Sequence, residues 1–148
     1  MSTTIGRAME ILMVEDSLFD ARSAIDSLKD CEIRHRLTLV RDGEEALAFL
    51  RREGVFARAP VPDLVLLDLV LPKVSGWEVL EEMRADEALR DLPVVVMTSS
   101  SAYDVQTYGE NLAVDSFIAK PLDREKFIRV IRQLRDRWHA DLMIPCLE

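Results

Sequence analysis

The sequence contains little cysteine and no long apolar run. Its two cysteines, Cys31 and Cys146, lie far apart and outside any Cys-x-x-Cys or Cys/His cluster, which favours free thiols in a reducing compartment over a disulfide or a zinc site. No apolar stretch approaches the ~20 residues that a membrane span requires. Residues 1–10 also lack the apolar core of a secretory signal. We therefore expect a cytoplasmic protein with no membrane partner.

Clusters of lysine and arginine are missing as well. The net charge is −8 and the isoelectric point is about 4.8, so the sequence argues against a nucleic-acid surface and favours proteins and cations as partners. With 148 residues, 49% of them hydrophobic, the chain is long enough to bury one real core. We expect residues 1–148 to form a single domain, with a core at about 9–138 and a short C-terminal tail at 139–148.

Short apolar runs alternate with amphipathic stretches along the chain. The runs predict strands at 11–14, 33–40, 64–67, 94–97 and 116–119. The second run alternates polar and apolar residues, which indicates an edge strand. The amphipathic stretches predict helices at 17–29, 44–52, 77–85, about 102–112 and 123–138. Pro60 and Pro62 place a surface loop at 55–62. Strands that alternate with helices over short connections predict an α/β fold, a parallel sheet with helices on both faces.

Polar side chains follow four of these strands where each strand ends. They are three carboxylates, a hydroxyl and an ammonium: Glu15, Asp16, Asp68, Thr98 and Lys120. In an open parallel sheet, ligands bind at the carboxyl ends of the strands. Carboxylates gathered there repel one another unless a cation lies among them, and an all-oxygen site suits Mg²⁺ or Mn²⁺. Such an ion offers open positions to phosphate oxygens, so one carboxylate can act as a nucleophile toward phosphorus.

Each of these residues also has an ordinary structural explanation. Asp16 or Asp68 alone is more often a helix cap, Thr98 a turn residue and Lys120 a solvated charge. Their joint occurrence at four strand ends of one sheet is what indicates a phosphoryl-transfer site, in which Lys120 and Thr98 stabilise charge on the phosphoryl oxygens.

From Ile11 to about Leu134 the chain resembles the receiver domains of two-component response regulators. The resemblance rests on four motifs: Val14-Glu15-Asp16, Leu66-Leu67-Asp68 followed by Pro72 and Gly76, Val96-Met97-Thr98-Ser99, and Phe117-Ile118-Ala119-Lys120-Pro121. It implies a flavodoxin-like (βα)5 fold with five parallel strands in the order 2-1-3-4-5.

The resemblance also implies a role for each matching residue. Asp68 becomes the phosphoacceptor, and the divalent metal is held by Asp16, by Asp68, by the backbone carbonyl of Val70 and, through water, by Glu15. Lys120 pairs with the phosphoryl oxygens.

The same resemblance makes Thr98 the switch hydroxyl that moves toward the phosphoryl group, with Phe117 the aromatic switch behind it. The Lys120-Pro121 bond is expected to be the family's cis peptide, which proline makes tolerable.

Three positions depart from the common receiver pattern. Glu15 stands where many receivers have Asp, so a water-mediated role suits it better than direct ligation. Val70 stands where a polar side chain is common and cannot position an attacking water, which predicts a long-lived phosphoryl group. Phe117 replaces the Tyr often seen, and the missing hydroxyl lowers the cost of burying the ring, so we expect it to rest partly inward.

The sequence also suggests partners. Residues 122–148 are too few for a DNA-binding output domain, so we expect regulation through protein contacts. The 55–62 loop and the tail 138–145 resemble stand-alone regulators of phytochrome histidine kinases, which implies a light-sensing kinase as phosphoryl donor and a homodimer through the fourth helix, fifth strand and fifth helix. The apolar stripe Phe127, Ile131, Leu134 and Trp138 continues into the tail, where an exposed patch would mark a partner site.

Several other functions compete with this interpretation. A phosphatase of the haloacid-dehalogenase type needs a second Asp two residues after its nucleophile, where Val70 stands. A flavin carrier of the flavodoxin type needs a Ser/Thr/Gly-rich phosphate loop where Glu15-Asp16-Ser17 stands. A pseudo-receiver used only as a scaffold would not need the intact acids, Thr98 and Lys120. A receiver can also serve as a phosphate sink and not as an output, and the sequence names neither the kinase nor the target.

Overall fold

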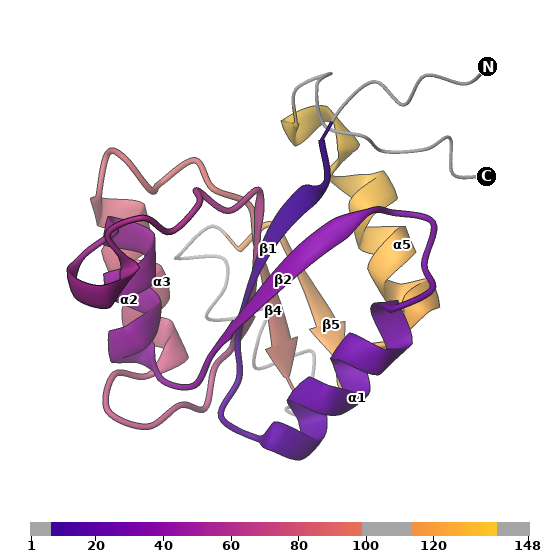
Figure 1. The fold of residues 1–148 in the computed structure, drawn as a ribbon, viewed down its shortest axis with the longest axis horizontal. Helices are drawn as coiled ribbons and strands as arrows, with labels where there is room; N and C mark the ends of the chain where they lie inside the picture. The colour runs from indigo at the N-terminus through magenta and orange to yellow at the C-terminus, as the bar shows by residue number, and fades with distance from the viewer. Residues whose placement is uncertain (1–6, 99–113, 139–148) are drawn as a thin grey trace.

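Five parallel strands form one sheet in the order β2-β1-β3-β4-β5, in a computed structural model that describes residues 7–98 and 114–138 (Figure 1). The strands are β1 (Met9–Val14), β2 (His35–Val40), β3 (Leu64–Asp68), β4 (Val94–Thr98) and β5 (Ser116–Ala119). The helices are α1 (Leu18–Leu28), α2 (Gly43–Arg51), α3 (Gly76–Ala85) and α5 (Arg124–Gln133), with short 3-10 turns η1 (Gly54–Phe56) and η2 (Arg135–Arg137). The α/β class and the strand order are confirmed.

The core forms two layers because the central strands bury both of their faces. Every residue of β1, β3 and β4 is buried, as expected for strands covered by helices on each side. One layer lies between the sheet and α1 with α5, and includes Met13, Leu66 and Phe127. The other lies between the sheet and α2 with α3, and includes Leu12 and Leu67. In Figure 1 these two helix pairs stand on opposite sides of the sheet.

Polar caps start each described α-helix close to the end of the preceding strand or loop. The side chains of Ser17, Asp42, Ser75 and Asp123 each accept a hydrogen bond from a backbone N–H in the first turn of the following helix. These caps fix where the chain turns from sheet to helix. They therefore fix the loops that carry the candidate site residues.

The predicted elements were largely right, with differences at their ends. Strand β2 begins at His35 and not at residue 33, and it lies at the edge of the sheet as its polar alternation predicted. The loop predicted at 55–62 overlaps the η1 turn, which begins one residue earlier. The helix predicted at about 102–112 and the tail 139–148 lie outside the described residues. No helix in the described part of the chain is long and apolar enough to cross a membrane.

The last helix corrects one expectation. Helix α5 ends at Gln133, and Phe127, Ile131 and Leu134 are all buried, so the apolar stripe belongs to the core. Trp138 is half-buried against the same layer, and its indole N–H donates to the backbone carbonyl of Asp63 at 2.7 Å. Trp138 itself is therefore not an exposed apolar side chain, because the start of β3 supplies a partner for the ring, and the tail beyond it lies outside the described residues.

Candidate functional site

Three of the expected residues meet at the carboxyl end of the sheet. Glu15 follows β1, Asp68 ends β3, and Lys120 follows β5. The Lys120 ammonium nitrogen Nζ lies 2.9 Å from Asp68 Oδ2, and 3.0 and 2.9 Å from the two carboxylate oxygens of Glu15. Glu15 is 1% exposed and Asp68 7%, so this contact is shielded from bulk water. Residues more than fifty positions apart in the chain thus lie together, because the carboxyl ends of parallel strands are all on the same side of the sheet.

A fourth side chain, which the sequence analysis did not single out, completes this cluster. Asp20 Oδ2 accepts a hydrogen bond from Lys120 Nζ at 3.1 Å, from the first turn of α1. Its side chain is 42% exposed, so it lies on the solvent side of the ammonium. The three hydrogens of Lys120 therefore have acceptors on Glu15, Asp68 and Asp20. The spacing of Asp20 from Asp16, one turn into the predicted helix, was the available signal.

Burial and charge shift the ionisation of the two innermost groups. Burial, together with the adjacent Asp68 carboxyl, raises the pKa of Glu15 to about 7, although Lys120 acts in the opposite direction. Burial lowers the pKa of Lys120, but its hydrogen bonds to Glu15, Asp68 and Asp20 outweigh that effect and raise it above the ordinary value. Lys120 is therefore a cation at neutral pH, and the carboxylates around it carry more negative charge than it balances.

Asp16 lies beside this cluster but turns away from it. Its side chain is 54% exposed and lies 3.9 Å from the Arg41 guanidinium. The Asp16 backbone carbonyl accepts hydrogen bonds from Nε and Nη2 of Arg41 at 3.2 and 2.9 Å. The structure thus brings together Glu15, Asp68 and Lys120, while the Asp16 carboxylate faces solvent.

The remaining expected residues surround Asp68. Thr98 is buried at the end of β4, and its backbone carbonyl accepts from the Lys120 N–H at 2.9 Å. The Val70 N–H donates to Asp68 Oδ1 at 3.1 Å, and its side chain is 78% exposed. Phe117 is 40% exposed on β5, more than a ring turned inward would leave. The Lys120-Pro121 peptide bond is cis, as the resemblance implied.

Gly76 allows the loop after Asp68 to fold back tightly. Its N–H donates to the Leu69 carbonyl at 3.1 Å, and a Cβ built on it would lie 2.2 Å from the carbonyl oxygen of Asp68. Real Cβ atoms do not approach that closely, so only glycine fits at this point. The start of α3 therefore holds the backbone of Asp68 in place.

The donor set suits a hard divalent cation, although its members are not gathered around one point. Glu15 and Asp68 supply carboxylate oxygens, and burial together with the adjacent Asp68 carboxyl raises the pKa of Glu15, an effect that a bound cation would oppose. Within 7–98 and 114–138 no three His, Cys, Asp or Glu side chains are arranged to hold a metal ion. The outward position of Asp16 accounts for this, since Asp16 is the expected direct ligand.

The Asp68 carboxylate thus ends a central strand, beside a lysine that follows the fifth strand and an acid that follows the first. The family model of the response regulator receiver domain matches residues 11–132. The chain belongs to this family, whose members are signalling proteins and generally not turnover enzymes.

Several relatives are similar over almost the whole chain. "Response regulator Rcp1" of Synechocystis sp. is 36% identical over 135 residues, which cover 91% of this chain and 92% of that protein. The structure of the bacteriophytochrome response regulator AtBRR has a TM-score of 0.80 at 34% identity and covers 90% of this chain and 97% of that one.

Two cyanobacterial structures carry further information. The phosphorylated phytochrome response regulator RcpA has a TM-score of 0.75 at 36% identity, covering 95% of this chain and 100% of that one. The Mn²⁺-bound form of Rcp1 has a TM-score of 0.73 at 36% identity, covering 93% and 99%. The chain is therefore a response regulator receiver homologous to phytochrome response regulators.

Proposed function

We propose that this receiver accepts a phosphoryl group on Asp68 from a histidine kinase and signals through protein contacts. The observation that carries the proposal is the 2.9 Å contact between Lys120 Nζ and Asp68 Oδ2 in a buried site. It leaves the other oxygen, Oδ1, with a hydrogen bond from the Val70 N–H at 3.1 Å. These two contacts fix the orientation of the carboxylate that would attack phosphorus.

In the proposed reaction, an oxygen of Asp68 attacks the phosphorus of a phosphohistidine. The O–P bond forms as the P–N bond breaks, the electron pair stays on the imidazole nitrogen, and an acyl phosphate results. Lys120 pairs with the phosphoryl oxygens, and Thr98 donates a hydrogen bond to one of them after moving toward the group.

A bound Mg²⁺ or Mn²⁺ supplies neutralisation of the charge on the phosphoryl oxygens. We propose that Asp16, Asp68 and the Val70 carbonyl hold it directly, with Glu15 acting through water. For this, the Asp16 carboxylate must leave its position 3.9 Å from Arg41 and turn toward Asp68. The manganese-bound form of the homologue Rcp1 supports the binding of a divalent cation.

The similarity to bacteriophytochrome and cyanobacterial phytochrome regulators supports a phytochrome kinase as the phosphoryl donor. We further propose a cytoplasmic homodimer that pairs through the fourth helix, β5, α5 and the tail, with residues 1–148 forming a single receiver domain. In this function the protein undergoes phosphorylation as a switch and does not turn over a substrate.

The decisive experiment uses acetyl phosphate with magnesium and intact-mass spectrometry. Wild type is expected to gain the mass of one phosphoryl group, and Asp68→Asn is expected to gain none. Asp136→Asn, which changes an exposed acid far along the chain, should behave as wild type. A phosphorylated Asp68→Asn protein would disprove the assignment.

The dimer has a separate test. Light scattering at high protein concentration should give twice the monomer mass, with or without acetyl phosphate. A monomer under both conditions would contradict the dimer and leave the phosphoacceptor assignment untouched.

A further inference from the structure

Strand β2 leaves one backbone edge of the sheet open. Among the strands that the structure describes its only neighbour is β1, and the N–H groups of Met9 and Glu15 donate to the carbonyls of Arg34 and Val40 at 2.9 and 3.0 Å. Alternate residues of a strand turn their backbone groups to the same side. The groups that point away from β1, with no backbone hydrogen bond in the described part of the chain, belong to His35, Leu37 and Leu39.

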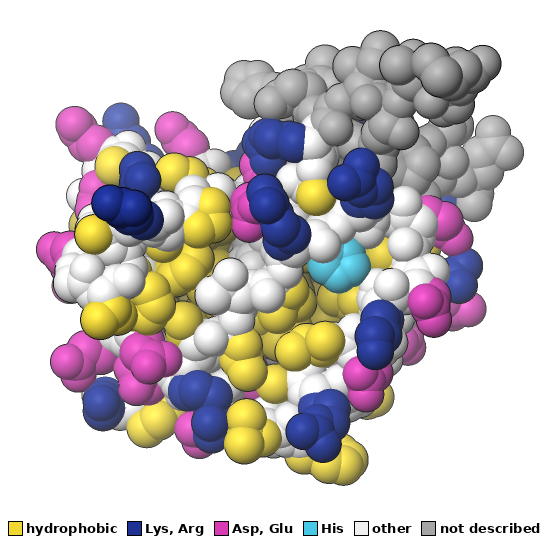
Figure 2. Space-filling model, viewed as in Figure 1, with side chains coloured by type: hydrophobic (Ala, Val, Ile, Leu, Met, Phe, Trp, Pro, Cys, Tyr) yellow, Lys and Arg dark blue, Asp and Glu magenta, His cyan; other side chains and the backbone are white. Residues whose placement is uncertain are grey.

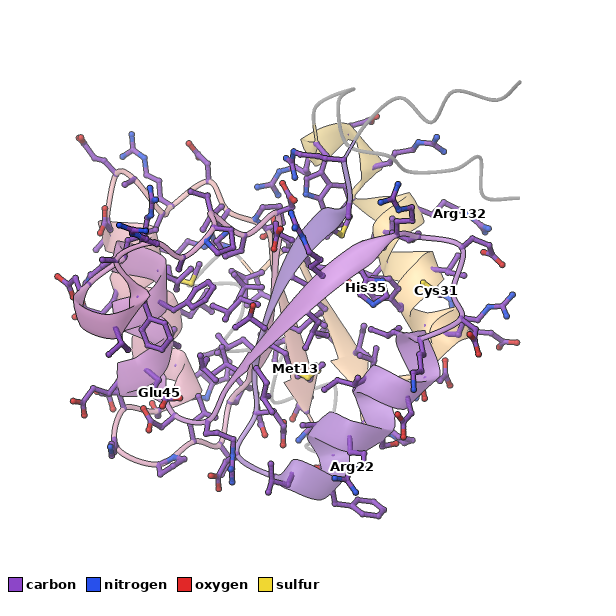
Figure 3. All side chains as sticks on the ribbon, in the orientation of Figure 1. Met13, Arg22, Cys31, His35, Glu45 and Arg132 are labelled. Atoms are coloured by element: carbon purple, nitrogen blue, oxygen red, sulfur yellow. The ribbon has the colours of Figure 1, made fainter. Side chains whose placement is uncertain are left out.

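A groove lined by cations lies at the start of this open edge. Its volume is about 750 Å³, and its lining includes Arg7, Lys29, Arg34 and Arg36 but no carboxylate. Figure 2 shows Lys and Arg side chains around the one described histidine on the face along which β2 runs. Figure 3 labels that residue, His35, near Cys31. The groove is at the opposite end of β1 from Glu15, so it is separate from the phosphoacceptor site.

Two of these cations have their charge balanced and two do not. Arg36 pairs with Glu10 at 2.6 Å, and Arg7 pairs with Asp63. Lys29 and Arg34 are exposed and form no ion pair with any residue that the structure describes. In a chain of net charge −8, a groove with two unbalanced cations is a local exception that attracts anions.

The floor of the groove is apolar. Ile25 of α1, Ile33 and Leu37 line it on the α1 side of β2. Leu37 packs against the core layer beneath α1, whereas Arg34 and Arg36 turn to the other face of β2 because side chains alternate along a strand. An added strand would therefore meet positive charge on one of its faces and apolar surface on the other.

We propose that the open edge of β2 and this groove bind an extended acidic segment of a partner protein, which adds to the sheet as a sixth strand. Its backbone pairs with the free groups of His35, Leu37 and Leu39. Its Asp or Glu side chains face Arg34 and Arg36, and its alternate apolar side chains lie over Leu37 and Ile25. Backbone pairing supplies the affinity and the alternating pattern supplies the specificity.

The same edge disfavours a second copy of this chain. When two β2 strands pair antiparallel through this edge with the pairing centred on Arg36 or Leu37, the two Arg36 side chains lie opposite or diagonally across from each other. Like charges at such positions are destabilising, and charged residues on edge strands are a common defence against self-pairing. The same positive charge on the edge strand therefore disfavours pairing with a second copy and favours pairing with an acidic strand.

The test titrates the ¹⁵N-labelled full chain with a blocked peptide of alternating glutamate and valine, at low salt. We expect shifts at the amides of His35, Leu37 and Leu39, with a dissociation constant on the order of 0.1–1 mM. The Arg34→Glu variant should bind about tenfold more weakly or worse, since one attraction becomes a repulsion. Arg90→Glu carries the same charge change outside the groove and should bind as wild type.

Two further controls separate the parts of the proposal. The same peptide with N-methyl groups on alternate amides keeps its charge but cannot pair as a strand, so it should not bind. A peptide with lysine in place of glutamate should not bind either. Equal binding of either control peptide, or equal binding of the acidic peptide by Arg34→Glu, would overturn the proposal.

Light scattering tests whether a second copy of the chain occupies the edge. A fall in the molecular mass of Arg34→Glu relative to wild type would point to a second copy as the occupant and would also overturn the proposal. Arg34→Glu should still be phosphorylated by acetyl phosphate at the wild-type rate, which verifies its folding.

Discussion

Lys120 contacts the other three charged side chains of the site, Glu15, Asp68 and Asp20. Its ammonium has acceptors from three separate elements, and two of them, Glu15 and Asp68, are nearly inaccessible to solvent. Removing the lysine would leave buried carboxylates without a counter-charge, which costs more than the pair contributes. Its partner on the solvent side, Asp20, is the member that can be changed with the least damage to the fold.

For that reason we expect Asp20→Ala to slow phosphorylation by acetyl phosphate about three- to tenfold, because Lys120 loses the acceptor that keeps it at the mouth of the site. Asp20→Asn keeps an oxygen acceptor and should be affected less. The measurement is the rate constant at saturating donor and magnesium, from intact-mass time courses. Asp26→Asn, an exposed acid on the same helix, is the control. Equal rates in Asp20→Ala and Asp26→Asn would contradict a positioning role.

Val70 determines a second property of the site, the lifetime of the phosphoryl group. It stands two residues after Asp68, is 78% exposed, and its apolar side chain offers no hydrogen bond to a water. We expect Val70→Asn to shorten the half-life of the phosphorylated protein about tenfold by positioning that water. The half-life is followed by intact mass after the donor is removed. A wild-type half-life of seconds with magnesium would refute the expectation of a stable phosphoryl group.

Gly76 shows how closely a single residue can be constrained by its neighbours. A methyl group at this position would overlap the carbonyl oxygen of Asp68, so Gly76→Ala should lower the free energy of unfolding by about 1–3 kcal/mol. It should also slow phosphorylation, since Asp68 must move.

Gly54→Ala provides the comparison for Gly76→Ala. Gly54 has φ +59° and open space around it, so its substitution should cost stability through backbone strain alone and leave phosphorylation unchanged. Denaturant titration and acetyl phosphate kinetics measure the two effects. A fully active Gly76→Ala protein would contradict the role assigned to this contact.

At the level of elements, helix caps connect the site to the rest of the fold. Asp123 begins α5, and its carboxylate accepts from the Lys126 N–H at 2.9 Å. We expect Asp123→Ala to lower the free energy of unfolding by about 1 kcal/mol, because a backbone N–H loses its partner. Asp136→Ala, an exposed acid in η2, should change stability little. Thermal unfolding measures both, and equal midpoints would argue against the cap.

The strands and caps could be predicted from the sequence because they depend on local patterns. The apolar runs of β1, β3 and β5 and the residues at their ends identified Glu15, Asp68 and Lys120 without a structure. What the sequence could not give was side-chain direction. The outward turn of Asp16 toward Arg41 and the inward reach of Asp20 depend on contacts between distant segments, which no spacing encodes. The burial of Trp138 was missed for the same reason, since its partner is Asp63.

At the scale of the whole molecule, the uneven charge of the site links metal binding to stability. A cation that binds only the folded chain stabilises it, by about 2.7 kcal/mol at a concentration one hundred times the dissociation constant. We therefore expect magnesium to raise the unfolding midpoint and EDTA to reverse this. In Asp16→Asn the response should be lost, whereas Asp26→Asn should keep it. An unchanged midpoint in wild type across millimolar magnesium would argue against a metal site.

Asp63 ties together both ends of the described chain. Its carboxylate binds Arg7 through two hydrogen bonds of 2.7 Å, and its carbonyl accepts from the Trp138 indole. Arg7 and Trp138 are therefore neighbours near the start of β3, whereas Asp68 lies at the carboxyl end of the same strand. A circularly permuted gene, with these ends joined by a short linker and new termini opened in the η1 loop, should still give a protein that accepts phosphate.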